Sequence, residues 1–280
     1  MFFTLYHICV TYWLTCITII CILGLLAIRE AGKSGTVAGL IYFGKFRKDY
    51  NFKTWLKMIE VPKRLFWIFY LIAFITVLFA FINIVIGDQL RCNGNPILTS
   101  LGLLLYLVHV LRRLYECLCI SIFSDSNMNI LHFLLGITFY PFCVCSQLSS
   151  FTLDGKAEIN LLSVLLYIVL TVGIFMVQIK QHHCFVLLAQ LRLRNGLNAN
   201  NVHAVPHGGL FEYCLSPHYF LEIVIYLLFA LIYQLSIPML LCFLFVTVNQ
   251  TIAALLNQSW YRRHFHEYLS NQKALIPYIL

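Results

Sequence analysis

Charged residues are scarce in this sequence, and acidic residues are the scarcer sign. Only 11% of the 280 residues are charged, with 11 Asp and Glu against 19 Lys and Arg, whereas 61% are apolar. A soluble domain has roughly 25% charged residues, so the composition excludes an ordinary soluble domain. The basic excess is divided among several separate segments, so we expect no nucleic-acid partner.

The sequence also lacks the common motifs of nucleotide-dependent and metal-dependent enzymes. No GxGxxG, P-loop or GxSxG motif occurs, so a nucleotide site would have to be of a non-Rossmann type. Neither HExxH nor CxxC occurs, and we expect no metal site. Most of the 11 cysteines lie in apolar segments, where a thiol behaves as a small hydrophobe, so a disulfide framework is not indicated.

Long apolar runs dominate what is present. A membrane-spanning helix needs about 20 consecutive apolar residues, and the runs predict an all-α integral membrane bundle of about seven transmembrane helices. We expect one membrane domain over residues 1–280, because little sequence remains for a soluble domain. The predicted helices cover residues 5–28, 65–87, 97–123, 128–148, 160–179, 219–236 and 239–260.

Basic residues follow the first, fifth and seventh predicted helices. Nine Lys and Arg lie in the segment from Arg29 to Arg64, both ends included, and Lys180 and Arg192 follow the fifth helix. The loops on the opposite side contain only two basic residues. The positive-inside rule therefore predicts that the N-terminus lies outside and the C-terminus in the cytosol.

Two groups of ionisable residues interrupt the apolar helices. His109, Arg113 and Glu116 share one face of the third predicted helix, and Arg112 stands four residues before Glu116. These residues form either a structural ion pair or a phosphate site, since two guanidinium groups face one carboxylate in this helix. At the start of the sixth helix, His218 and Glu222 are also four residues apart, where they form either a helix cap or part of a binding site.

Three further polar segments invite a functional interpretation. The run from Gln181 to Cys184 looks like a metal cluster, but consecutive helical residues point about 100° apart and do not readily chelate one ion. Glu60 is either a solvated loop carboxylate or a proton donor that a loop brings to the site. The sequon at Asn249–Thr251 falls inside a predicted helix and is read as a chance match.

Several short motifs are specific in their order and wording. They are HAVPHGGLFEY at 203–213, SPHYFLE at 216–222, WY at 260–261, KALIPY at 273–278, and upstream VPKR at 61–64 and RRLYECL at 112–118. The C-terminal motifs resemble the steroid 5α-reductase family of membrane oxidoreductases, and the two upstream motifs resemble its polyprenol reductase branch. In the steroid branch a tyrosine typically follows the histidine of the third helix, where this chain has Val110.

The resemblance implies a seven-helix enzyme of the endoplasmic reticulum membrane that uses NADPH. It implies saturation of the α-isoprene unit of polyprenal or polyprenol on the route to dolichol and N-glycosylation, with no obligate protein partner. An aldehyde is favoured as the acceptor, because its carbonyl withdraws electrons from the β-carbon. The resemblance places Glu60 beside the position of the family's catalytic carboxylate. We expect Glu60 to donate a proton to the developing enolate oxygen. The implied cofactor-binding residues are Arg113, Gln181, His183, Arg192, His218, Glu222 and Tyr261.

Three positions depart from the family pattern, and several alternatives stay open. Phe185, Gln258 and Gln272 each replace a polar or charged side chain, which bears on the preference for NADPH over NADH. A steroid 5α-reductase is the alternative enzyme. A non-catalytic lipid-binding protein with seven helices would bind no nicotinamide nucleotide, and a prenylcysteine methyltransferase-like enzyme would bind S-adenosylmethionine in the same cavity.

Overall fold

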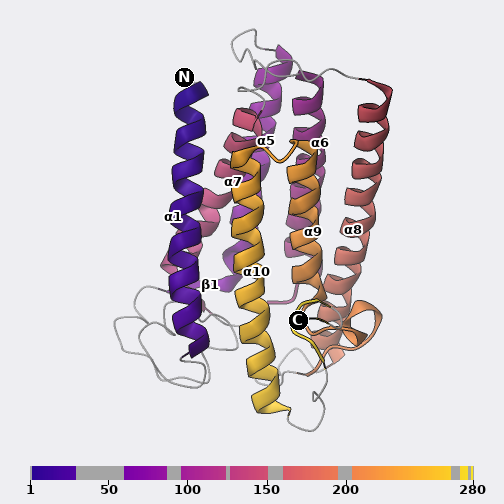
Figure 1. Cartoon of the computed structure of the whole chain (residues 1–280). Coiled ribbons are helices and arrows are strands. Elements are labelled where there is room, and N and C mark those ends of the chain that lie inside the picture. The colour runs from indigo at the N-terminus through magenta and orange to yellow at the C-terminus, as the bar shows by residue number, and fades with distance from the viewer. Residues whose placement is uncertain are drawn as a thin grey trace.

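The protein is a bundle of nearly parallel and antiparallel helices (Figure 1). The computed structural model describes residues 2–29, 60–86, 96–123, 127–150, 160–194, 204–265, 272–276 and 279. Its α-helices are α1 (Phe2–Arg29), α5 (Trp67–Ile86), α6 (Pro96–Tyr115), α7 (Ile130–Ser150), α8 (Leu161–Arg194), α9 (Pro217–Ile232) and α10 (Ile237–His264). The short elements are β1 (Glu60–Pro62), η1 (Lys63–Phe66), η2 (Glu116–Ile120), β2 (Asn127–Asn129) and η3 (Gly209–Glu212).

Within these residues, six helices are long and apolar enough to cross a membrane, and α9 is a shorter apolar helix of 16 residues. The bundle exposes large apolar side chains along its outer face, including Leu161, Leu162 and Ile179 on α8. Such a surface suits hydrocarbon and not water. The prediction of an all-α membrane bundle of about seven helices is therefore confirmed, and the chain is a multi-span membrane protein.

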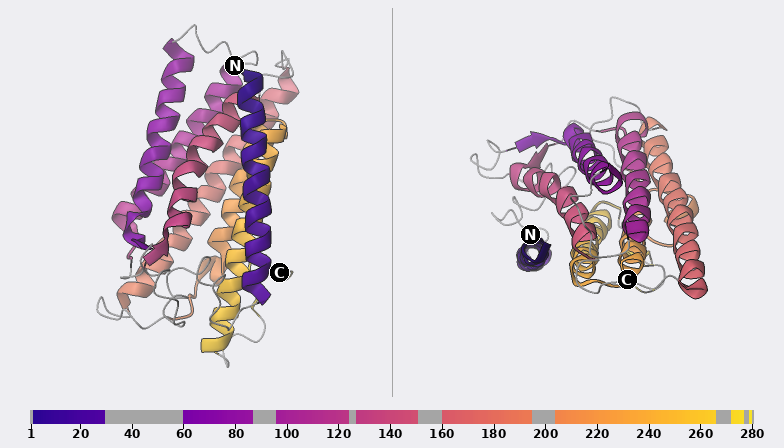
Figure 2. Two further views of the ribbon diagram at one scale, coloured as in Figure 1. Left: turned by 90° about the vertical axis from the view of Figure 1, so that its left-hand side faces the viewer. Right: turned by 90° about the horizontal axis from the view of Figure 1, so that it is seen from above.

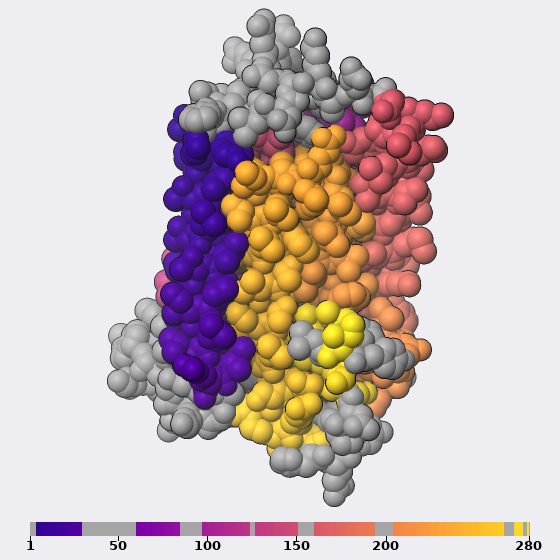
Figure 3. Space-filling view, viewed as in Figure 1, coloured from indigo at the N-terminus to yellow at the C-terminus, as the bar shows by residue number. Residues whose placement is uncertain are grey.

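The described helices pack around a shared core that runs through the bundle. Trp13 on α1, Tyr106 on α6 and Phe229 on α9 are fully buried in one cluster with apolar residues of α5, α7, α8 and α10. Helix α1 packs against α10 and α7 at the edge of the bundle (Figure 2). The C-terminal residues lie on the bundle surface beside α10 (Figure 3), where Ala274 and Leu275 are buried.

Three predicted boundaries are wrong. Helix α8 continues to Arg194, well beyond the predicted end at residue 179, so Lys180 and Arg192 lie on the helix and not in a loop. Helix α9 ends at Ile232, and Gln234 and Leu235 adopt positive φ in the tight turn before α10. The third predicted helix changes at Glu116 into a short π-helix that ends at Ile120.

A two-stranded ladder closes the bundle at the end where α5 and α7 begin. Strand β1 pairs antiparallel with β2, with Glu60 opposite Asn129 and Pro62 opposite Asn127. The fourth predicted helix begins at residue 128, inside this strand, whereas α7 begins at Ile130. Three residues are too few for a period-two pattern to show in the sequence. The ladder joins the chain before α5 to the chain before α7.

Candidate functional site

The end of α6 presents its ionisable side chains toward α8 and α9. Glu116 opens the π-helical segment, a geometry that is often found at functional sites. Its carboxylate is fully buried and accepts a hydrogen bond of 2.6 Å from Arg112 Nη1 and one of 2.5 Å from Arg113 Nη1. His182 Nδ1 on α8 lies 2.9 Å from the same carboxylate. One buried anion thus holds three basic side chains, two from α6 and one from α8.

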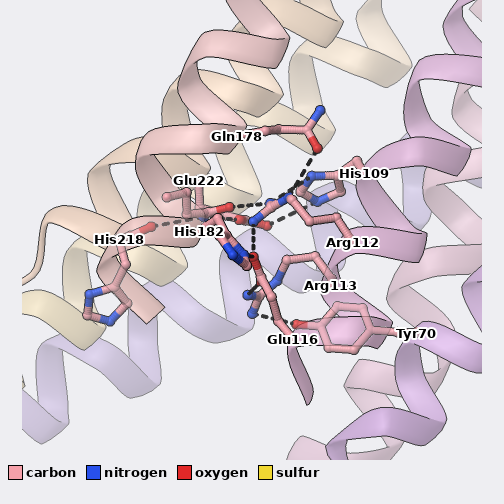
Figure 4. A network of polar contacts seen from close by, with 10 residues as sticks. Tyr70, His109, Arg112, Arg113, Glu116, Gln178, His182, His218 and Glu222 are labelled. Atoms are coloured by element: carbon pink, nitrogen blue, oxygen red, sulfur yellow. Dashed lines mark hydrogen bonds and ion pairs between the residues drawn. The ribbon is translucent and has the colours of Figure 1, made fainter. Parts of the chain in front are cut away.

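The two ionisable groups predicted from the sequence join into one network (Figure 4). The Gln181 side chain accepts a hydrogen bond of 2.5 Å from Arg112 Nη2 and donates one of 2.5 Å to Glu222 Oε2. His109 Nε2 lies 3.7 Å from Glu222 Oε1. The surplus positive charge inferred from two arginines and one glutamate is therefore offset by Glu222, which the sequence places 106 positions beyond Glu116.

A cavity of about 410 Å³ lies beside this network. Five of the predicted cofactor-binding residues are in its wall, namely Arg113, Gln181, Arg192, His218 and Glu222. Most of its apolar wall comes from η1, α5, α7 and α10, through Phe66, Phe69, Leu135, Gly136, Phe139, Phe245 and Val246. The site is thus a mostly apolar chamber in a membrane bundle with a charged region supplied by α6, α8 and α9.

Arg113 is held between hydrogen bonds and an aromatic ring. Its Nη2 donates a hydrogen bond of 2.9 Å to the Tyr70 hydroxyl, while Nη1 bonds Glu116. The guanidinium carbon lies 4.0 Å from the centre of the Phe185 ring, within cation–π range. Phe185 is one of the three departures from the family pattern. Its ring face nevertheless contacts and stabilises Arg113.

Comparison with known proteins shows which family this chain resembles. The family model described as 3-oxo-5-alpha-steroid 4-dehydrogenase matches residues 126–280. A polyprenal reductase of Xenopus laevis is 30% identical over 268 residues, covering 86% of this chain and 84% of that protein. The chain belongs to the steroid 5α-reductase family. Polyprenal reductases of Caenorhabditis elegans, 30% identical over 87% of both chains, and of Homo sapiens, 29% identical over 70% of this chain and 64% of that one, are further relatives.

Three residues that the family resemblance assigns to the site are not in the cavity wall. Glu60 accepts a hydrogen bond of 2.9 Å from Asn127 across the strand ladder. His183 is exposed and lies against Gly209, where an added Cβ would be 3.2 Å from the imidazole. The buried Tyr261 donates a hydrogen bond of 3.4 Å to the carbonyl of Ala204. Their roles in a steroid 5α-reductase family site stay predictions.

Side chains that the sequence reading left out also line the cavity of this family member. Lys63 and His132 are near the strand ladder, and Asn249 and Gln250 come from the middle of α10. Lys63 belongs to the VPKR motif, which gave the available signal. The two amides belong to the sequon that is interpreted as a chance match, although a polar pair within a membrane helix is itself a signal.

The consecutive polar residues on α8 diverge as their helical spacing predicts. Gln181 bonds Glu222, His182 contacts Glu116, His183 faces Gly209 and Cys184 is buried in a small apolar cluster. Because the four side chains point to four different partners, they do not form a chelating set. Among the described residues, no three His, Cys, Asp or Glu side chains converge as a metal site would require.

Proposed function

We propose that this protein uses NADPH to reduce the α-isoprene double bond of polyprenal, in the endoplasmic reticulum membrane. The observation that carries the proposal is the cavity inside the membrane bundle, whose wall combines a charged network with a largely aromatic and aliphatic lining. The relatives named polyprenal reductase support the substrate, because the likeness extends over 86% of the chain.

The donor set of the cavity fits a reduced nicotinamide nucleotide. Its volume of about 410 Å³ is within the range of small-molecule sites. Arg113, Arg192 and Lys63 are cationic groups suited to phosphate, while Gln181 and His218 are polar groups suited to ribose or carboxamide. When bound, NADPH supplies a hydride, and a proton completes the saturation of the double bond.

The residues of the chain position and shield this chemistry. Glu116 and Tyr70 fix the Arg113 guanidinium at the cavity wall, so its orientation is set before a ligand binds. The Phe185 ring covers one face of that guanidinium, with the guanidinium carbon 4.0 Å from the ring centre. Charged groups held in a dry, preorganised site interact more strongly with a ligand than the same groups do in water.

An aldehyde acceptor fits the chemistry better than an alcohol. An isolated double bond is a poor hydride acceptor, whereas the carbonyl of an α,β-unsaturated aldehyde withdraws electrons from the β-carbon. The apolar wall from α5 and α7 suits the isoprenoid tail, which is itself a component of the lipid phase. The location of the site within the bundle then allows a substrate to reach it without leaving the membrane.

A 3-oxo-Δ4-steroid is the second candidate substrate, because the description of the matching family model names that activity. Both substrates are conjugated carbonyl compounds, so the same hydride logic applies to either. Their difference is shape, a rigid ring system against a flexible chain. The comparison of whole chains favours the polyprenal substrate, since the likeness to polyprenal reductases begins well before residue 126, where the family match starts.

The test is a reconstituted assay. Purified protein in liposomes is given NADPH with either polyprenal or a 3-oxo-Δ4-steroid, and the products are identified by mass spectrometry. We expect dolichal and oxidation of an equal amount of NADPH, with at least tenfold less steroid product. Steroid reduction alone would favour the second candidate. No product and no NADPH binding would instead favour a non-catalytic lipid-binding protein.

A further inference from the structure

Two amide side chains in the middle of α10 face the cavity. Val246, Asn249, Gln250 and Ala253 all line it, and they occupy positions i, i+3, i+4 and i+7 of the helix. This spacing is one continuous helical face, so one side of α10 forms part of the cavity wall. The two amides stand twelve and thirteen residues after Ile237, near the centre of the 28-residue helix.

In the part of the chain that the structure describes, neither amide has a protein partner, in contrast with other polar residues of α10. The Thr247 hydroxyl donates to the Phe243 carbonyl at 2.8 Å, and Asn257 Nδ2 donates to Ser216 Oγ at 2.9 Å. Gln258 Nε2 donates to the Gln272 carbonyl at 3.0 Å. Burying a polar group at membrane depth costs free energy unless the group is hydrogen-bonded. We therefore expect the two amides to bind a polar group of a ligand.

The chemical nature of the amides indicates which ligand group that is. The cationic side chains of the cavity are Arg113, Arg192 and Lys63, which come from α6, α8 and η1 and suit phosphate. An amide is neutral and offers two N–H donors, so it binds a neutral carbonyl oxygen without adding a charge to a low-dielectric site. Helix α10 packs between α9, which carries Glu222, and α7, which carries much of the apolar wall. A ligand group against α10 therefore borders both regions.

We propose that Asn249 and Gln250 donate hydrogen bonds to the aldehyde oxygen of the substrate, an inference that rests on the proposed polyprenal reductase function. When hydride adds to the β-carbon, the C=C electron pair moves to form the enolate and the carbonyl oxygen gains negative charge. The enolate then takes a proton from water at the α-carbon, which restores the C=O bond. Donors that face this oxygen stabilise the charge as it develops, an effect worth about 10²–10³ in rate for one donor in other enzymes.

The inference assigns the oxygen-binding role to different residues than the family resemblance does. The resemblance offers Glu60 as the donor, but Glu60 lies in the strand ladder with Asn127 and is not in the cavity wall. The amides of α10 are in the wall. Substitutions at the two places therefore separate the two assignments.

The experiment compares Asn249→Leu, Gln250→Met, the double variant and Glu60→Gln with Thr247→Val in liposomes. Thr247→Val is the matched control, because it removes a polar group from the same turn of α10 whose partner is the helix backbone. Three quantities are measured: kcat/KM with polyprenal, the Kd for NADPH, and inhibition by dolichal and by a polyprene hydrocarbon that lacks oxygen. Inhibition by the hydrocarbon and the Kd for NADPH show whether each variant is folded.

We expect the double variant to lose about 100-fold in kcat/KM and tenfold in affinity for dolichal, with hydrocarbon inhibition and NADPH affinity within twofold of wild type. Unchanged kcat/KM in the double variant, with a large loss in Glu60→Gln, would overturn the inference. A tenfold loss of NADPH affinity would overturn it as well, since the amides would then serve the cofactor. If wild type binds dolichal through the amides without reducing polyprenal, the inference stands and the proposed reaction fails.

Discussion

Glu116 compensates the charge of two guanidinium groups within a membrane-spanning helix. It is fully buried and accepts hydrogen bonds from Arg112 and Arg113, and it also contacts His182 on α8. Removing one partner of a buried ion pair destabilises the fold far more than replacing both partners with apolar residues, because it leaves an uncompensated buried charge. The network is therefore both a constraint on the packing of α6 against α8 and the support that orients Arg113.

We predict that Glu116→Gln destabilises the protein and weakens cofactor binding. The amide keeps the shape of the side chain but leaves two guanidinium groups facing no anion in this position, at a cost of about 3–5 kcal/mol. Thermal unfolding in detergent should shift to lower temperature, and the KM for NADPH should rise. Arg262→Gln on the exposed end of α10 is the control. An unfolding temperature equal to that of wild type would show that Glu116 does not balance the arginines.

Arg113→Ala and Arg192→Ala should each raise the KM for NADPH more than they lower kcat. Both side chains line the cavity and both are assigned to phosphate, so their removal weakens ground-state and transition-state binding together. Steady-state kinetics at saturating polyprenal checks this, with Arg262→Ala as the control. A fall in kcat at unchanged KM would assign the arginines to the chemical step and not to binding.

Sequence reasoning found the polar residues within each helix better than the contacts between helices. The i, i+4 spacing correctly pairs Arg112 with Glu116. The apolar context singles out Glu222, which lies in the cavity wall, and its role in a binding site stays a prediction. It did not reveal that Gln181 joins the two groups, since spacing in one helix carries no information about which helix lies opposite. The Asn249 and Gln250 pair was visible in the sequence but was explained by a motif that does not apply inside a membrane.

Helices α5 and α7 approach closely at Gly136, which lies in the cavity wall. A Cβ added at Gly136 would be 2.7 Å from the Phe69 ring, too close for any real contact. Phe69 also lines the cavity. The glycine thus leaves room for the ring, and the position of the ring sets the width of the apolar part of the chamber.

Gly136→Ala should therefore lower kcat/KM for polyprenal by about tenfold while the Kd for NADPH stays within twofold, because the displaced ring moves within the apolar wall. The matched control is Gly173→Ala on α8, where the nearest atom is 3.6 Å from the added Cβ. That control should stabilise the helix by about 1 kcal/mol. Equal activity of both variants would indicate that the substrate does not contact this part of the wall.

The length of α8 was underestimated for a physical reason. Hydropathy falls at Lys180, where the predicted helix stops, but the helix continues for another four turns to Arg194. Its polar side chains there are satisfied by other elements, with Gln181 bonded to Glu222, His182 near Glu116, and Arg192 donating to the Ile122 carbonyl. Apolar length alone marks where a helix can lie in lipid, and not where its hydrogen bonds end.

The bundle as a whole has two chemically different ends. The N-terminus is at the upper end in Figure 1, and α10 finishes at the lower end, as expected for an odd number of spans. Arg29, Arg192 and Arg262 lie near the ends of α1, α8 and α10, which all run toward that lower end. The distribution of basic residues, including those between 30 and 59 outside the described residues, predicts that this end faces the cytosol.

Labelling single cysteines in sealed microsomes tests the orientation. A cysteine in place of Arg262, in a variant without the native cysteines, should react with a membrane-impermeant maleimide added outside cytosol-facing vesicles. A cysteine at Thr4 should react only after the membrane is permeabilised. The opposite labelling pattern would show the opposite orientation in the membrane. The nucleotide site would then lie on the side that lacks the cytosolic NADPH pool.

The most direct measurement follows deuterium from the cofactor to the lipid. Liposomes that contain the protein are given polyprenal and NADPH with deuterium at both C4 positions, and the product is examined by mass spectrometry. If the cavity brings the two molecules together, dolichal will carry one deuterium, at the β-carbon, and Arg113→Ala will slow its appearance at low NADPH. Dolichal without deuterium, or no dolichal from protein that binds both molecules, would contradict this mechanism.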